Sequence, residues 1–354
     1  MLRILLILAL ALFGCLPTTP TPIPTDTSTS TLTNTLTPTV TSTRTPTRTI
    51  IPSNTSTPTA TRTPAPTVSP STVVLCRNQV LTGTVPNQLF RVNSDRFPEA
   101  SNPNKVKLID NCAFHDVVLS VQEVNNLRVV NSRFEASGNL WISGQDNPLL
   151  RLNARSGSRI EHVVIDNNRF LNAGSDSIIC GAGVNFGRYI TVTNNLFDRG
   201  GEQAGLDAKL CEHILMDGNV HISSGVEPNC NFTSSGCSLT DTDNVFHDNG
   251  GSGSPGTGRA CYILLTNNSY SSQRGVVVSS GSCNAEIRGN RFTSSGVTFL
   301  GDSTTGFLIV VDNVFTRGSI WIEDHVGECR VAGNSRDSGS AVPITILRSQ
   351  CSIQ

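Results

Sequence analysis

Short runs of β-branched and aliphatic residues alternate along the chain with a polar turn that keeps returning. A clear copy is Val192-Thr-Asn-Asn-Leu-Phe197, in which an apolar run ends at an asparagine that is followed two residues later by a ring. The same Asn-x-ring turn begins at Asn168, Asn195, Asn219, Asn244, Asn268, Asn290 and Asn313, and altered copies end at Phe114, Phe134 and Arg336. The ring position recurs at spacings of 20, 36, 27, 24, 25, 24, 22, 23 and 21 residues. A period near 23 residues predicts a stacked repeat architecture.

Each repeat has the parts of one coil. A β-rich run such as His162-Val-Val-Ile165 precedes the turn, a glycine such as Gly201 follows four residues after the ring, and a second β-rich run such as Ile320-Trp-Ile322 comes next. No repeat has room for a helix of useful length. The pattern therefore predicts an all-β parallel β-helix of about ten coils. Its rings would stack inside, and its asparagines would form a ladder of amides that bond to neighbouring coils.

The Asn-x-ring turns and the glycines after them resemble those of the right-handed parallel β-helix superfamily, the pectate-lyase-like fold. The resemblance covers roughly residues 105–350. It implies a right-handed parallel β-helix but no single activity, because this fold hosts lyases, hydrolases, epimerases, phage spikes and adhesins.

The N-terminus is predicted to direct export. Residues 1–14 read as a signal peptide, with Arg3 before an apolar segment too short to span a bilayer. Leu12-Phe-Gly-Cys15 resembles a bacterial lipobox, although Phe13 departs from the usual small or short-aliphatic residue. We expect cleavage before Cys15 and lipidation of that cysteine, which would anchor the protein outside the cell. Ordinary secretion with loss of Cys15 is the alternative.

Composition divides the remainder into a stalk and a folded domain. Residues 15–72 are dominated by Thr, Pro and Ser, which predicts a disordered, extended stalk. Residues 73–354 are assigned to one β-helix domain, with about 73–105 as its N-terminal cap because they lack the repeat. The formal net charge of −1, with acidic and basic residues interspersed, argues against a nucleic-acid partner.

The cysteine positions predict disulfide bonds. Of 11 cysteines, ten remain after Cys15, an even number in an exported chain. The repeat places Cys261 and Cys283 at one site on adjacent coils, and one coil rise fits the usual Cα separation of a disulfide. Zinc binding is the alternative, and the absence of any CxxC spacing weakens it. The expected pairs are Cys76–Cys112, Cys180–Cys211, Cys230–Cys237, Cys261–Cys283 and Cys329–Cys351.

One cluster suggests catalysis. If Leu206 and Ala208 point inward, Asp207 and Lys209 share the outer face of a strand. A lysine beside carboxylates could serve β-elimination of an acidic sugar, with a base at the C5 proton and a cation on the uronate. The candidate catalytic residues are Asp207, Lys209, Glu202 and Arg188. A surface salt bridge explains the same residues.

Two further features suggest ligands. Trp141 and Trp321 each lie between aliphatic residues, so strand alternation points both rings outward, where they could support a sugar ring or be covered by a loop.

Asp302, Glu323 and Asp324 recur after strands of consecutive coils and could bind Ca²⁺, or they could be solvated loop charges. No other cofactor is expected.

These observations favour a domain that is displayed outside the cell and engages extracellular polysaccharide or cell-wall glycan as a binding or adhesive module. The alternative is a polysaccharide lyase or glycoside hydrolase that acts on an acidic glycan, and the sequence leaves the choice open. The glycoside hydrolases of this fold carry adjacent Asp-Asp pairs, whereas no Asp-Asp dipeptide occurs in this chain.

Overall fold

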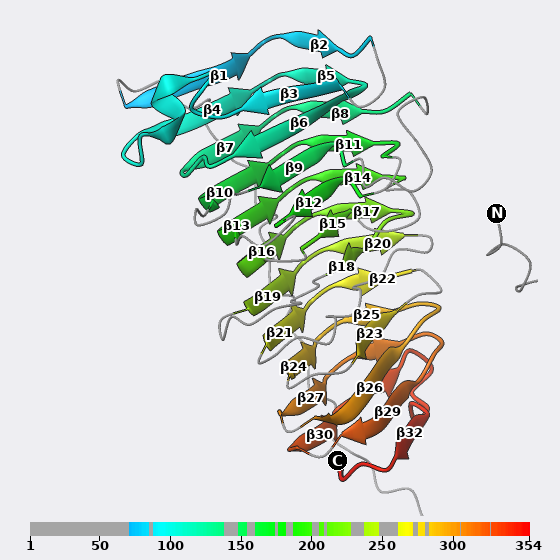
Figure 1. The fold of residues 1–354 in the computed structure, drawn as a ribbon. Helices are drawn as coiled ribbons and strands as arrows, with labels where there is room; N and C mark the ends of the chain where they lie inside the picture. The colour runs from blue at the N-terminus through cyan, green and yellow to red at the C-terminus, as the bar shows by residue number, and fades with distance from the viewer. Residues whose placement is uncertain are drawn as a thin grey trace, which may run out of the picture. The chain divides into compact units, whose positions relative to one another are not determined.

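The computed structural model describes residues 71–84, 88–137, 148–153, 160–173, 176–181, 187–199, 205–208, 211–227, 237–247, 261–271, 275–279, 283–304, 306–325 and 327–354. These residues form an all-β parallel solenoid, as the repeat predicts (Figure 1). Within them, the 3-10 helix η1 (Pro98–Ser101) accompanies the strands. The predicted signal peptide, Cys15 and almost all of the stalk lie outside the described residues.

In the part of the chain that the structure describes, four parallel sheets make up the solenoid. The first stacks 12 strands: β1 (Thr72–Arg77), β4 (Val106–Asp110), β7 (Leu127–Val130), β10 (Ile160–Asp166), β13 (Gly187–Thr193), β16 (Cys211–Asp217), β19 (Cys237–Thr242), β21 (Cys261–Thr266), β24 (Cys283–Arg288), β27 (Leu308–Val311), β30 (Cys329–Ala332) and β33 (Ser352–Ile353). The second stacks 11: β2 (Val80–Thr82), β5 (Ala113–His115), β8 (Arg133–Glu135), β11 (Arg169–Leu171), β14 (Leu196–Asp198), β17 (Val220–Ile222), β20 (Val245–His247), β22 (Ser269–Tyr270), β25 (Arg291–Phe292), β28 (Val314–Phe315) and β31 (Ser335–Arg336).

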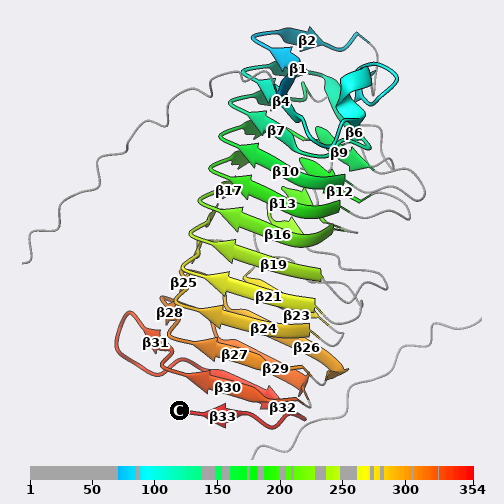
Figure 2. The ribbon, with the colours of Figure 1, turned by 90° about the vertical axis from the view of Figure 1, so that its left-hand side faces the viewer.

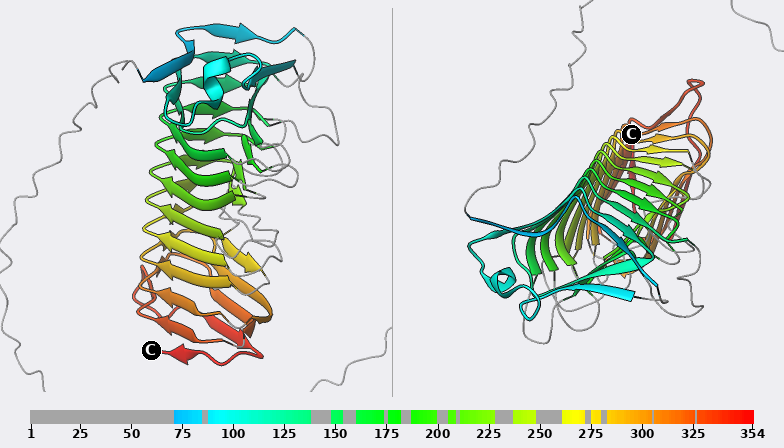
Figure 3. Two further views of the ribbon diagram at one scale, coloured as in Figure 1. Left: turned by 60° about the vertical axis from the view of Figure 1, so that its left-hand side comes forward. Right: turned by 90° about the horizontal axis from the view of Figure 1, so that it is seen from above.

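Among the described residues, the third side of the solenoid comprises two sheets. The six-stranded sheet contains β3 (Gln88–Val92), β6 (Val117–Gln122), β9 (Leu150–Asn153), β12 (Ile178–Cys180), β15 (Leu206–Asp207) and β18 (Val226–Glu227). The four-stranded sheet contains β23 (Val276–Ser279), β26 (Val297–Thr304), β29 (Ile320–His325) and β32 (Ile344–Leu347). Figures 2 and 3 show the strands of the first sheet succeeding one another in chain order, with a gradual twist.

The expected number of about ten coils needs correction, because the count of strands differs from side to side among the described residues. Within them, the first sheet stacks 12 strands, the second 11, and the third side six and then four. Part of residues 73–105, expected to be a cap, also supplies strands, since β1, β2 and β3 pair with β4, β5 and β6. The terminal coils lack a clear Asn-x-ring turn, so the sequence repeat does not reveal them.

The predicted asparagine ladder lies inside the turn between the first and second sheets. Each ladder Oδ1 accepts the backbone N–H of the ladder residue one coil earlier, as Asn195 does from Asn168 at 2.8 Å. Each Nδ2 donates to a carbonyl of an earlier coil, as Asn195 does to Ile165 at 2.9 Å. The pattern runs from Asn168 through Asn195, Asn219, Asn244, Asn268, Asn290 and Asn313 to Asn334. Buried amides are satisfied here by the stacking itself.

The predicted ring stack fills the core beside this ladder. Neighbouring ring centroids lie 4.5 to 5.1 Å apart, close to the spacing of parallel strands. The members are Phe114, Phe134, Phe170, Phe197, His221, Phe246, Tyr270, Phe292 and Phe315, all fully buried. One ring per coil therefore supplies a continuous apolar column.

The residue before each ladder position turns the chain with a left-handed backbone. Asn167 and Asn194 take φ of 54° and 55° there, and Gly289 takes 64°. Asparagine and glycine adopt this conformation more readily than other residues. At Gly289 a Cβ would also lie 2.9 Å from Asn267 Oδ1, so the space, as well as the conformation, favours glycine.

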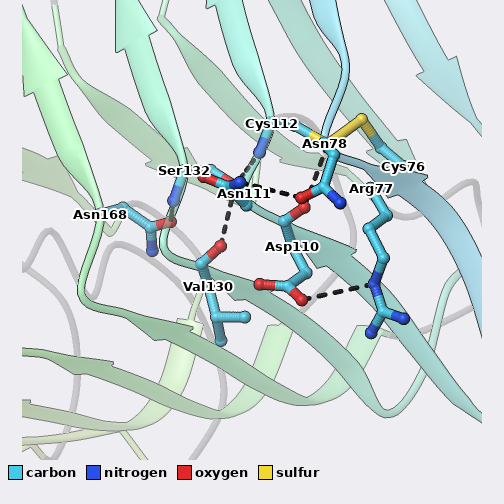
Figure 4. The surroundings of a disulfide bond; sticks show 9 residues. All are labelled: Cys76, Arg77, Asn78, Asp110, Asn111, Cys112, Val130, Ser132 and Asn168. Atoms are coloured by element: carbon cyan, nitrogen blue, oxygen red, sulfur yellow. Dashed lines mark hydrogen bonds and ion pairs between the residues drawn. A yellow bond between two sulfur atoms is a disulfide. The ribbon is translucent and has the colours of Figure 1, made fainter. Parts of the chain in front are cut away.

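A disulfide joins the first two coils next to the start of the ladder (Figure 4). Cys76 and Cys112 lie 6.4 Å apart between Cα atoms. The Cys112 N–H donates to Ser132 Oγ at 3.1 Å, and the Ser132 N–H donates to Asn168 Oδ1 at 2.8 Å. Serine thus replaces asparagine as the first ladder member.

Three of the five predicted disulfides are confirmed: Cys76–Cys112, Cys180–Cys211 and Cys329–Cys351. The backbone register places Cys261 opposite Cys283, and also places Cys237 opposite Cys261. The Cys230–Cys237 and Cys261–Cys283 bonds themselves lie outside the described side chains. Cross-links between stacked coils limit the freedom of the unfolded chain.

Replacing Asn195 by alanine tests the ladder. The change leaves the Asn168 N–H and the Ile165 carbonyl buried without partners, and each costs on the order of 1–3 kcal/mol. We expect the free energy of unfolding to fall by about 2–6 kcal/mol in urea titrations. Asn194→Gly is the matched control, because this outer neighbour has a left-handed backbone, and should stay within about 0.5 kcal/mol of the parent. Equal losses in both variants would contradict the ladder's role.

His221 predicts a pH dependence of stability. Complete burial lowers the pKa of His221 to about 3, whereas an unfolded histidine titrates near 6.5. As pH falls from about 6.5 towards 3, only the unfolded chain gains this proton, so stability falls by up to ~1.4 kcal/mol per pH unit. Urea unfolding of the parent and of His221→Phe across this range should show a shallower acid loss in the variant. Parallel curves would contradict the assignment.

Candidate functional site

The strand that carries the predicted catalytic aspartate is placed as the alternation suggests, but the aspartate is not accessible. Leu206 and Ala208 belong to the hydrophobic core. Asp207 lies between them on β15, opposite Ile179 of β12 and Glu227 of β18. Asp207 is only 1% exposed. A carboxylate at this depth does not meet a dissolved polymer in this conformation.

Arg188 lies in a different sheet from Asp207. It belongs to β13 of the first sheet, where the register places it between Glu161 of β10 and Glu212 of β16. Its Nε donates to Glu212 Oε2. The hydrogen bond to Glu212, with a smaller contribution from the charge of Glu161, raises the pKa of Arg188. The described residues therefore show Arg188 engaged in an ion pair, and Glu202 and Lys209 lie outside them.

Trp321 is exposed on the third side, as its neighbours predict. Ile320 and Ile322 are fully buried, whereas Trp321 on β29 is 38% exposed. The indole N–H donates to Glu323 Oε2 at 3.4 Å. Glu323 Oε1 in turn accepts from Arg348 Nη2 at 2.6 Å. This chain of contacts restrains the orientation of the ring. Trp141 lies outside the described residues.

The predicted calcium ligands on this face are committed to an arginine. Arg348 forms ion pairs with Glu323 at 2.6 Å and with Asp324 at 3.0 Å. The side chain of Asp302 lies outside the description. Among the described residues, no group of three or more His, Cys, Asp or Glu side chains is arranged to hold a metal ion. A cation at Glu323 and Asp324 would have to displace the guanidinium.

The first sheet carries an aromatic feature that the repeat pattern did not predict. The rings of His162, Tyr189 and His213 stack on its outer surface, with successive centroids 5.0 Å apart and planes within 10°. They belong to β10, β13 and β16, which lie side by side in Figure 2. We call these three residues the outer ring column. All are exposed, Tyr189 to 46%.

An unusual backbone presents these rings. His162, Tyr189 and His213 have φ values of 58°, 55° and 55° in the middle of their strands. The left-handed conformation is uncommon for tyrosine, whereas histidine, like asparagine and aspartate, adopts it more often than most residues do. It moves these rings to the outside while Val163 and Ile190, the next residues, stay in the core.

The sequence did hold a signal for this column. Each of its rings lies six residues before a ladder asparagine: Asn168, Asn195 and Asn219. The same offset gives Ser238, Tyr262, Asn284 and Phe307 on later coils. Once the ladder asparagines are identified, the residues six positions before them are therefore predicted to form one row on the surface.

Asp241 is a charged residue that the structure buries in the first sheet, a position that the sequence analysis did not assign to it. The register puts it between Met216 and Leu265 in an inward row of the first sheet, and it is fully buried. Its Oδ1 accepts a hydrogen bond from Asn244 Nδ2, a ladder amide. Alternation from buried Leu239 would have pointed Asp241 inward. The contact ties it to the ladder, so it is not available as a surface ligand.

The chain matches no protein-family model, and no curated protein is similar enough to count as a match. In the described part of the chain, no helix has the length and apolar character needed to cross a membrane.

The Trp321 network makes a prediction about Glu323. The hydrogen bond from Arg348, and then that from the Trp321 indole, lower the pKa of Glu323. In Arg348→Ala the pKa of Glu323 should rise towards the ordinary glutamate range, which carboxyl-carbon NMR titration would detect. Arg330→Ala, an exposed arginine on β30, is the matched control and should leave that pKa unchanged. An unchanged Glu323 pKa in Arg348→Ala would refute the network.

Proposed function

We propose that the β-solenoid domain binds extracellular polysaccharide as a non-catalytic, adhesive module, with Trp321 as a sugar platform. The observation that carries the proposal is the exposed indole held by Glu323 and Arg348. An apolar ring face with fixed polar groups beside it suits a sugar, which has an apolar face and hydroxyl edges. A parallel solenoid is also compatible with a polysaccharide-interacting domain.

The strands beside Trp321 support this assignment. Register places Thr298 of β26 and Thr345 of β32 on either side of it. Threonine hydroxyls donate and accept hydrogen bonds, and both side chains are partly exposed. A platform ring between hydroxyl-bearing neighbours can orient a sugar without charge.

A lyase or hydrolase centred on Asp207 has less support. Asp207 is 1% exposed, and Arg188 lies in another sheet, paired with Glu212. A base and an electrophilic cation must both reach the substrate. This arrangement favours the binding module over the enzyme.

The proposed setting is the outside of the cell. Three disulfides in the described residues are typical of an oxidising compartment. We further propose that lipidated Cys15 and the Thr/Pro-rich segment display the domain, as the sequence pattern suggests. The discriminating test for that part is mass spectrometry of the mature N-terminus, in which an unmodified first residue other than Cys15 would refute it.

Replacing Trp321 by alanine tests the platform. In a glycan array followed by calorimetry with the polymer retained best, we expect the Kd of Trp321→Ala to rise at least about tenfold, a loss of about 1.4 kcal/mol. Trp321→Phe keeps an aromatic face and should lose less. The melting temperature should fall only modestly, since Trp321 is 38% exposed and lies outside the core. Binding by Trp321→Ala that equals the parent's, or turnover of the bound glycan, would contradict the proposal.

A further inference from the structure

The outer ring column is not required by the fold. The register of β10 against β7 places Asn126 at the position of His162, and Asn126 takes the same left-handed conformation, with φ of 55°. Asparagine adopts this conformation with little strain. One coil therefore meets the backbone requirement without a ring, while the next three meet it with His162, Tyr189 and His213.

The backbone at these positions also bears on their role. The left-handed conformation is disfavoured for a tyrosine such as Tyr189, whereas an asparagine adopts it with less strain. The stacked ring pairs offset part of that cost. Residues held in sparsely populated backbone conformations cluster at functional sites.

The chemistry of the surface beside the column defines what it would accept. The outer faces of β10, β13 and β16 carry the partly exposed carboxylates of Glu161, Asp166 and Asp217. Glu212 is only 4% exposed, and its charge is offset by Arg188, so the net charge is −3 with neutral histidines. The guanidinium is already paired with Glu212. A polyanion would be repelled here.

The carboxylates and rings of this surface can form hydrogen bonds with the hydroxyl groups of a ligand. Carboxylates accept hydrogen bonds from O–H donors, and a phenol or an imidazole can donate or accept. The ring edges form an apolar ridge, and the column repeats these groups every 5.0 Å. An extended polymer with regularly spaced hydroxyls can therefore make similar contacts on successive coils.

From these observations we propose that the outer ring column is a second binding site, specific for a neutral, hydroxyl-rich polysaccharide that lies along the stacking direction across β10, β13 and β16. The inference rests on the proposed polysaccharide-binding function but uses a different sheet from Trp321. It also assigns the ligand class, since the acidic border disfavours uronate polymers.

Tyr189→Asn is the direct test, because asparagine fits the left-handed backbone and removes the central ring. Isothermal calorimetry with the full-length protein should use cellohexaose, xylohexaose and mannohexaose as neutral probes and hexagalacturonate as the acidic probe. We expect at least one neutral hexaose to bind, hexagalacturonate to bind more weakly, and Tyr189→Asn to lose about tenfold or more in affinity. Its melting temperature should stay close to the parent's, since relief of backbone strain at one residue offsets much of the loss of the two ring contacts.

Two controls separate this site from the Trp321 platform. Asn126→Gly has the same backbone conformation and no ring to lose, so its binding should be unchanged. If Trp321→Ala reduces binding and Tyr189→Asn does not, the proposed function stands and the outer ring column is refuted. If only Tyr189→Asn reduces binding, the column stands and Trp321 is not the platform. Should Tyr189→Asn fail to fold, His213→Asn gives the same test.

Three results would overturn the inference. They are parental affinity in both asparagine variants, tighter binding of hexagalacturonate than of every neutral hexaose, and a large fall in melting temperature of folded Tyr189→Asn with affinity retained. The last result would assign the rings to stability.

Discussion

Buried amides that must find hydrogen-bond partners in neighbouring coils govern this structure. An asparagine in the core loses water at both its donor and its acceptor, and an unpaired buried group costs on the order of 1–3 kcal/mol. In this chain the partners are the backbone groups of adjacent coils and the next asparagine, as at Asn219 and Asn244. The ladder is satisfied only when the coils stack in register, so it converts a local sequence repeat into a long-range structure.

The other regular features follow from that register. With the ladder fixed, the ring two residues later meets its counterpart at 4.5 to 5.1 Å, and the strands on either side pair in parallel. Among the described residues, the third side also pairs in parallel, in a six-stranded and a four-stranded sheet. The outer positions are free of this constraint, so the row that includes Tyr189 varies from coil to coil and can carry binding groups.

The interior could be predicted from the sequence because its determinants recur at fixed offsets. The ladder, the ring stack and the disulfide Cys329–Cys351 all follow from the period. The surface could not be predicted in the same way. Strict alternation does not anticipate the left-handed backbone at Tyr189, and it places Asp207 outward without showing that the carboxylate is covered. Ion pairs such as Arg188 with Glu212 join residues one coil apart, which only the final register brings together.

Native-state hydrogen exchange tests the central claim most directly. The backbone N–H groups of Asn168, Asn195, Asn219, Asn244, Asn268 and Asn290 are buried and donate to the side chain of the next ladder asparagine. The account predicts that these amides exchange only through global unfolding and are among the slowest in the protein. Exchange of these amides as fast as that of exposed turn positions would show that the ladder does not hold the coils together.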